Sequence, residues 1–124
     1  MSKKKILVIE DDPDMRLALH VRLKANDFDV VHAGDAVASI SEARKNGPDL
    51  ILLDLGLPGG DGYVVMQRLK SNIQLSTIPI IVVSARDREA NEARSLLAGA
   101  EAYLQKPVDN AVLLETIRRA ICPG

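Results

Sequence analysis

The sequence predicts an α/β protein built on a doubly wound sheet of five parallel strands and five helices. Short β-branched runs alternate with longer segments of helical periodicity five times along the 124 residues. The runs are largely apolar, which is typical of strands buried on both faces of a sheet. The chain is also shorter than the roughly 200 residues of a (β/α)₈ barrel. An open sheet remains, and the flavodoxin-like strand order 2-1-3-4-5 is expected from that class.

The first half of the chain contains three predicted strands and two predicted helices. In chain order they are strand Lys5–Glu10, helix Pro13–Ala25, strand Asp29–Ala33, helix Asp35–Lys45 and strand Leu50–Asp54. Asp12 is suited to cap the first helix, and Pro13 to its first turn, where a missing N–H is harmless. The predicted apolar face of that helix comprises Leu17, Ala18, Val21 and Ala25. Gly47-Pro48 ends the second helix.

The second half of the chain contains the remaining five predicted elements. They are helix Asp61–Ser71, strand Ile78–Ser84, helix Asp87–Ala98, strand Ala102–Leu104 and helix Asp109–Ile121. Pro79 is tolerable near the start of its strand. Gly99 ends the helix Asp87–Ala98. Nothing in the sequence divides the chain, so residues 1–124 are expected to form a single domain.

Composition excludes several classes of protein. The 16 basic and 17 acidic residues nearly cancel, which argues against direct nucleic-acid binding by bulk electrostatics. Cys122 is the one cysteine, so a disulfide within the chain and a cysteine-based zinc site are excluded. The apolar runs are too short to cross a membrane, and the basic start of the chain lacks the apolar stretch of a signal peptide. We therefore expect a cytoplasmic location.

Polar side chains follow the strands at the point where each strand ends. Glu10, Asp11 and Asp12 close the first strand, Asp54 the third and Ser84 the fourth, and Lys106 follows the fifth. Because ligands of such sheets bind at the carboxyl ends of the strands, we expect these groups to converge at one edge. Each residue alone also has an ordinary structural explanation, such as a helix cap, a turn or a solvated surface amine. Their joint occurrence is what indicates a site.

Carboxylates this close repel one another unless one of them is protonated or a cation binds. Hard oxygen ligands without a nearby histidine or thiol favour Mg²⁺. An ammonium group, a hydroxyl and a metal around a carboxylate are suited to phosphoryl transfer, with the carboxylate as nucleophile. Asp54 is the central candidate, since it ends a buried strand in the middle of the cluster.

These residues resemble the receiver domain of bacterial response regulators, the phosphorylated partner in two-component signalling. The resemblance spans about residues 4–121 and depends on motifs in combination. They are Ile6–Pro13, Pro48–Leu55, Leu57–Gly62, Pro79–Ala85 and Ala102–Pro107.

The resemblance implies a role for each site residue. Asp54 is the implied phosphoacceptor, and Mg²⁺ is implied at Glu10, Asp11, Asp54 and the backbone carbonyl of Gly56. Lys106 and Ser84 are implied to contact the phosphoryl group, and a cis Lys106–Pro107 peptide is expected. Ser84 and Tyr103 are the implied switch: Ser84 moves toward the phosphoryl group, and Tyr103 turns inward beneath the fourth helix. The changed surface then comprises the fourth helix, the fifth strand and the fifth helix.

This sequence departs from the usual pattern of the family at two positions. Gly56 is smaller than the residue usually found there, and Ser84 stands where Thr is commoner. The resemblance also implies that Gly56 and Arg86 influence how long the aspartyl phosphate lasts, in opposing directions. The lifetime is therefore left open.

The partners implied by the resemblance are a histidine kinase or a histidine phosphotransfer protein, and a downstream protein or an attached output domain. The docking face for the kinase is expected on the first helix, around Met15, Arg16 and Leu19, together with the loop after the fifth strand. A homodimer through Glu115, Arg118 and Arg119 is an open alternative to simple solvation of these residues. The chain is expected to catalyse only its own phosphorylation and dephosphorylation, so it is not an enzyme in the ordinary sense.

Three other functions fit the sequence less well. A phosphatase of the haloacid-dehalogenase type needs a second carboxylate two residues after its nucleophile, where this chain has Gly56. A carrier of flavin mononucleotide needs a phosphate-binding loop after the first strand, whereas Glu10–Asp12 repels phosphate. A degenerate receiver that binds partners without phosphorylation is disfavoured by the intact Asp54 and Lys106.

Overall fold

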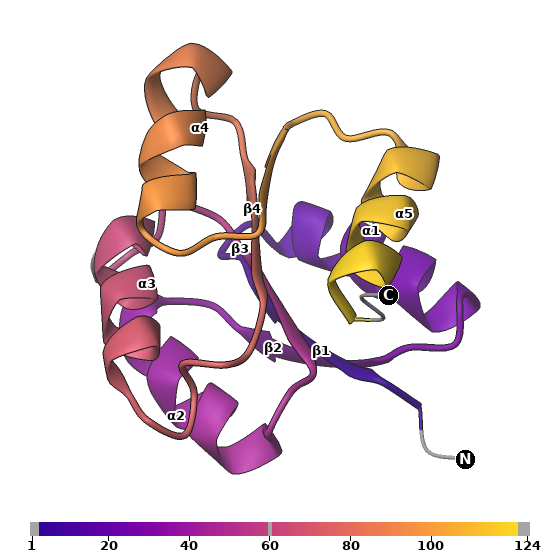
Figure 1. Ribbon diagram of the computed structural model, residues 1–124. Helices are drawn as coiled ribbons and strands as arrows, with labels where there is room; N and C mark the ends of the chain where they lie inside the picture. Colours follow the sequence, from indigo (N-terminus) through magenta and orange to yellow (C-terminus); the bar gives the residue numbers. More distant parts are fainter. Residues whose placement is uncertain (1–2, 60, 122–124) are drawn as a thin grey trace.

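A parallel sheet of five strands forms the centre of the protein, in the order β2-β1-β3-β4-β5. A computed structural model describes residues 3–59 and 61–121 (Figure 1). The strands are β1 (Lys5–Ile9), β2 (Asp29–Ala33), β3 (Leu50–Leu53), β4 (Ile80–Ser84) and β5 (Ala102–Gln105). The helices are α1 (Pro13–Ala25), α2 (Ala36–Asn46), α3 (Gly62–Ser71), α4 (Arg88–Leu97) and α5 (Asn110–Ile121). The predicted fold class and strand order are confirmed.

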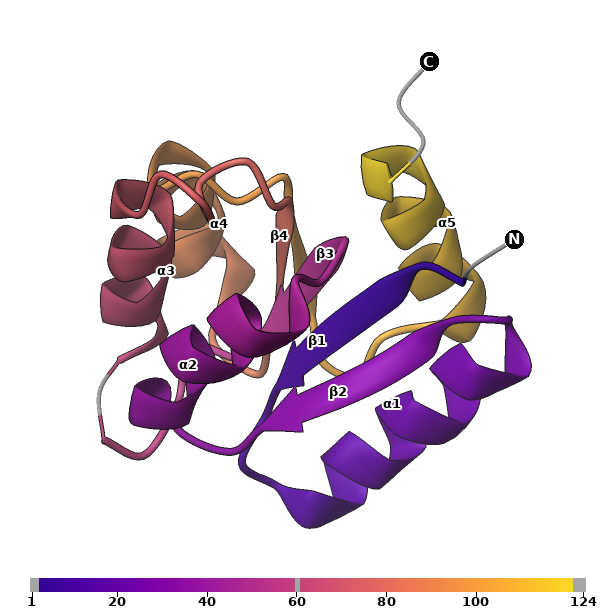
Figure 2. The same cartoon turned by 90° about the horizontal axis from the view of Figure 1, so that it is seen from below.

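The helices cover the two faces of the sheet in two groups. Helices α1 and α5 lie on one face, and α2, α3 and α4 on the other (Figures 1 and 2). Successive residues of β1 alternate between the two cores: Ile6 and Val8 pack toward α1 and α5, whereas Leu7 and Ile9 pack on the opposite side. Because both faces are covered, the central strands are apolar throughout, as the sequence indicated.

The apolar face predicted for α1 is wrong. Leu17 and Val21 are 62% and 57% exposed, whereas Leu19 and Leu23 belong to the core. The helix carries apolar residues on more than one side, so periodicity does not select the inward face. Leu19 is therefore removed from the predicted docking surface.

Aspartates cap four helices at the edge where the strands end. The side chains of Asp12, Asp35, Asp61 and Asp87 each accept a hydrogen bond from a backbone N–H in the first turn of α1, α2, α3 and α4. A cap of this kind stabilises a helix by about 1 kcal/mol, and it fixes where the chain leaves the sheet. Gly47 ends α2 in the left-handed conformation, as predicted. Cys122 lies outside the described residues.

The loop after Asp54 returns close to the sheet before α3 begins. The N–H of Gly62 donates to the carbonyl of Leu55 at 2.8 Å, so the first turn of α3 rests directly on the backbone beside Asp54. Within the described residues, no helix is long and apolar enough to cross a bilayer.

Candidate functional site

Three carboxylates meet where β1 and β3 end. Glu10 and Asp11 follow β1, and Asp54 follows β3; β1 and β3 are neighbours in the sheet. One oxygen of each carboxylate lies within 4.8 Å of the other two, and no other such group of acids, histidines or cysteines was found among the described residues. Glu10 is buried, Asp54 is half-buried and Asp11 is exposed. The convergence predicted for these three residues is confirmed.

The ammonium group of Lys106 lies between two of these carboxylates. Its Nζ is 2.6 Å from Oε1 of Glu10 and 3.6 Å from Oδ2 of Asp54. The sequence indicated two ways to relieve the repulsion between these carboxylates, protonation of one of them or binding of an external cation. The structure adds a third, because the chain supplies part of the compensating charge itself.

Burial and charge act in opposite directions on this pair. Burial raises the pKa of Glu10, the nearby charge of Asp54 raises it further, and the hydrogen bond from Lys106 only partly offsets this. Burial by itself lowers the pKa of Lys106, but its bond to Glu10 and the charges of Asp54 and Glu10 outweigh that and raise it. Lys106 is therefore held in the charged form. The peptide bond between Lys106 and Pro107 is cis, as expected.

The donor set fits Mg²⁺. The three groups offer only carboxylate oxygens, the hard ligands that this ion prefers, and the exposed Asp11 leaves the site open to water. Gly56 lies two residues beyond Asp54, and its N–H donates to Oδ1 of Asp54 at 3.4 Å. The role of the Gly56 carbonyl as a metal ligand stays a prediction.

Ser84 and Tyr103 are linked through the backbone of Arg86. The N–H of Arg86 donates to Oγ of Ser84 at 3.1 Å, and the hydroxyl of Tyr103 donates to the carbonyl of Arg86 at 2.5 Å. Both Ser84 and Tyr103 are buried, and burial raises the pKa of the tyrosine hydroxyl. Tyr103 was expected to turn inward only after phosphorylation, but in this structure its ring is already inside.

Arg86 and Asp61 form an ion pair that no sequence pattern indicated. The guanidinium of Arg86 donates to Oδ2 of Asp61 at 3.0 Å and to the carbonyl of Leu55 at 3.3 Å. Partial burial raises the pKa of Asp61, but hydrogen bonds from Tyr63 N–H and Arg86 outweigh this and lower it. Both side chains are more than a third exposed, so the pair adds little stability. Its effect is to connect the loops after β3 and β4.

A second pair of titratable groups lies away from this site. Nδ1 of His20 on α1 and Nε2 of His32 on β2 are 3.0 Å apart, and Nδ1 of His32 is buried without a hydrogen-bond partner among the described residues. Burial and the charges of His20 and Arg16 lower the pKa of His32. A neutral His32 that donates from Nε2 leaves only an acceptor unpaired, so the neutral ring is the stable form.

Comparison with known proteins identifies the family. A model of the response regulator receiver domain matches residues 6–118. The chain belongs to this family. It is 32% identical over 117 residues to the protein PilH of Pseudomonas aeruginosa, covering 94% of this chain and 97% of PilH. It is 38% identical to the KDP operon transcriptional regulatory protein KdpE of Escherichia coli, again over 94% of this chain but only 50% of KdpE.

Solved structures agree with this assignment. The receiver domain of the sensor histidine kinase PA1611 from Pseudomonas aeruginosa superimposes with a TM-score of 0.86 at 28% identity, covering 97% of this chain and 98% of that one. That structure is described with a magnesium ion coordinated in its active-site cleft. The chain thus spans nearly all of some relatives and about half the length of others, such as KdpE.

Proposed function

We propose that this receiver domain takes a phosphoryl group from a phosphohistidine onto Asp54 and passes the signal on through the surface formed by α4, β5 and α5. The observation that carries the proposal is the position of Lys106, 3.6 Å from Asp54 and beside carboxylates that suit a divalent cation. A nucleophilic carboxylate flanked by positive charge is the arrangement that in-line phosphoryl transfer needs.

The transfer itself is a single displacement. A carboxylate oxygen of Asp54 attacks phosphorus, the phosphorus–nitrogen bond of the phosphohistidine breaks, and its electron pair leaves with the imidazole. Glu10, Asp11 and Asp54 would hold Mg²⁺, which would supply charge neutralisation at the phosphoryl oxygens. Lys106 binds one of these oxygens and gives up part of its bond to Glu10. The chain thereby acts on itself alone.

The hydrogen bonds around Arg86 provide a route from the phosphoryl group to α4. Ser84 turns its hydroxyl toward the new oxygens, which removes the acceptor of the Arg86 N–H. The carbonyl of the same residue holds the hydroxyl of Tyr103, and Asp87, the cap of α4, follows directly. A change at Ser84 therefore alters the start of α4, while Tyr103 remains inside the protein and changes only its hydrogen bond.

The partners follow from this chemistry. The donor is a histidine kinase or a histidine phosphotransfer protein, and Leu17 and Val21 on α1 replace Leu19 as its predicted apolar contacts, because both are exposed. The signal then passes to a downstream protein or to an attached output domain, and the proposed location of the chain is the cytoplasm. In α5, Arg119 pairs with Glu115 of the same helix at 2.9 Å, so these two residues have a local partner whether or not a homodimer forms.

Phosphorylation by a small-molecule phosphodonor with Mg²⁺ tests the proposal directly. Intact-mass measurement is expected to show one added phosphoryl group, absent in Asp54→Asn and in wild type without Mg²⁺. Asp11→Ala should weaken both labelling and the rise in melting temperature that Mg²⁺ produces. The matched control is Asp14→Ala, an exposed acid of the first turn of α1 outside the carboxylate cluster. Labelling that persists in Asp54→Asn refutes the assignment.

A further inference from the structure

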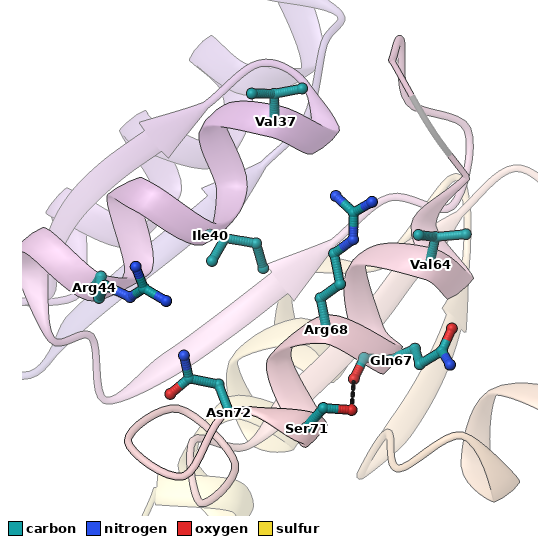
Figure 3. Close-up of a pocket in the computed structure, with 8 residues that line it drawn as sticks. All are labelled: Val37, Ile40, Arg44, Val64, Gln67, Arg68, Ser71 and Asn72. Atoms are coloured by element: carbon teal, nitrogen blue, oxygen red, sulfur yellow. Dashed lines mark hydrogen bonds between the residues drawn. The ribbon is translucent and has the colours of Figure 1, made fainter.

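A groove runs between α2 and α3 on the face of the sheet away from α1 and α5. It encloses about 660 Å³. Its lining residues fall three and four positions apart on each helix, so each helix contributes one continuous stripe. They are Val37, Ile40 and Arg44 from α2, and Val64, Gln67, Arg68, Ser71 and Asn72 from the α3 side. Figure 3 shows Ile40 and Arg44 of α2 and Arg68 and Asn72 of the α3 side directed toward the space between the two helices.

Three of the eight residues that line the groove are apolar, namely Val37, Ile40 and Val64. Ile40 packs against the core beneath, whereas Val37 and Val64 are 73% and 39% exposed. The stripe from Val37 to Arg44 covers two helical turns, about 10 Å. A surface of this length and composition matches the helix-in-groove mode of recognition, in which an amphipathic helix lays its apolar side chains between two helices.

Two arginines give the groove a positive charge. The guanidinium groups of Arg44 and Arg68 project toward the space between the helices in Figure 3, and no ion pair found among the described residues includes either of them. The one acid of the two helices, Glu42, accepts a hydrogen bond from Asn46 instead. With four basic residues against that single acid, α2 and α3 carry a net charge of +3 in a chain whose net charge is −1.

This charge also decides which occupant fits. A two-fold interface between copies of the chain would place the same patch on both sides and bring arginines against arginines. Such like charges in a desolvated interface are costly, so pairing through this groove is disfavoured. An acidic partner gains from the same charges.

We infer that the α2–α3 groove binds an amphipathic helix of a partner protein whose apolar stripe is flanked by carboxylates. The apolar stripe covers Ile40, Val37 and Val64, and the carboxylates pair with Arg44 and Arg68. The inference does not depend on phosphorylation of Asp54, because none of these residues belongs to the carboxylate cluster.

Nuclear magnetic resonance on the whole isotope-labelled chain provides the test. Two synthetic helical peptides are used that share one leucine stripe and differ only in carrying glutamate or lysine beside it. The glutamate peptide is expected to shift the amide signals of residues 37–44 and 64–72, and the lysine peptide is not. Arg44→Glu combined with Arg68→Glu should weaken binding of the glutamate peptide by about tenfold or more and allow the lysine peptide to bind.

Controls separate a groove from a general charge effect. Arg118→Glu with Arg119→Glu makes the same change of charge on α5 and should leave the affinity for the glutamate peptide within about twofold. Arg68→Gln, a milder change, should weaken it in the same direction as the double reversal. Equal binding of both peptides, shifts confined to other elements, an equal loss in the α5 control, or no shift with the glutamate peptide would each overturn the inference.

Discussion

Gly62 is the residue at which a single methyl group should damage both the fold and the site. A Cβ at this position would lie 2.6 Å from the Cα of Leu55 and 2.8 Å from the carbonyl oxygen of Asp54. Both are backbone atoms, so no side chain can rotate away. Normal contact between carbons is about 3.5–4.0 Å, so Gly62→Ala has to move α3 or the loop after β3 by about 1 Å.

The magnitude follows from two opposing contributions. Overpacking of this kind costs about 1–3 kcal/mol, whereas alanine is favoured over glycine in a helix by at most about 1 kcal/mol. We therefore expect Gly62→Ala to lower the free energy of unfolding by about 1–2 kcal/mol and the melting temperature by roughly 5 °C. Because the atoms that must move belong to Asp54 and Leu55, the increase in melting temperature caused by Mg²⁺ should shrink as well.

Urea unfolding followed by circular dichroism measures the free energy of unfolding, and thermal unfolding with and without Mg²⁺ measures the melting temperatures. The control is Gly34→Ala, whose added Cβ would meet only the flexible end of Arg16, at 3.2 Å. This control should stay within about 0.5 kcal/mol of wild type. A Gly62→Ala protein as stable as wild type, with the full response to Mg²⁺, would refute the idea that α3 must approach the Asp54 loop this closely.

Two further predictions concern the charged pairs. The pKa of His32 is lowered in the folded protein from the ordinary 6.5, so the unfolded chain binds more protons below that pH and stability falls as the solution is acidified. In urea unfolding between about pH 7 and pH 5, His32→Gln should reduce the decrease in the free energy of unfolding with falling pH, and His20→Gln should reduce it in part. The same pH dependence in wild type and both variants would contradict the reasoning. Lys106→Met leaves the buried Glu10 without its cation and should cost about 3 kcal/mol at neutral pH, while Lys24→Met, at an exposed pair, should cost less than about 1 kcal/mol.

Local patterns were sufficient for the elements and for the edge where the site lies. Alternation of apolar strands and helical segments is a local property, and so are the cap Asp12 and the helix end at Gly47, so all ten elements follow from short stretches of sequence. Asp35, Asp61 and Asp87 were predicted as first residues of their helices, whereas the structure has them as caps. The carboxyl ends of parallel strands share one edge, which is why Glu10, Asp11 and Asp54 were expected together. Bounds shifted by one or two residues where a cap or turn takes over, as at Asp54, which follows β3.

Contacts between distant residues were beyond the same reasoning. Lys106 was expected at the phosphoryl group, but in the structure its shortest ion pair is with Glu10, 96 positions earlier. The pair of Arg86 with Asp61 likewise joins two loops whose separation no local pattern fixes. The prediction of the buried face of α1 was wrong for another reason. Leu17 and Leu19 are equally apolar, and only the position of the sheet decides which of them is buried.

The manner in which α4 is attached supports the proposal that a small change at Ser84 moves this helix. Ser95 is the one buried residue of this helix, and Leu97 is 90% exposed, so few apolar side chains anchor it. Tyr63 donates to Oδ1 of Asn91 at 2.8 Å and lies 3.7 Å beneath the guanidinium of Arg94, and Arg88 donates to the carbonyl of Tyr103. Polar contacts of this kind exchange for water at a net cost of about 1 kcal/mol each, whereas a helix anchored by leucines would lose several times that. A helix that buries one residue and is held by such bonds can shift without disturbing the core, and it begins only a few residues after Ser84, the hydroxyl proposed to contact the phosphoryl group.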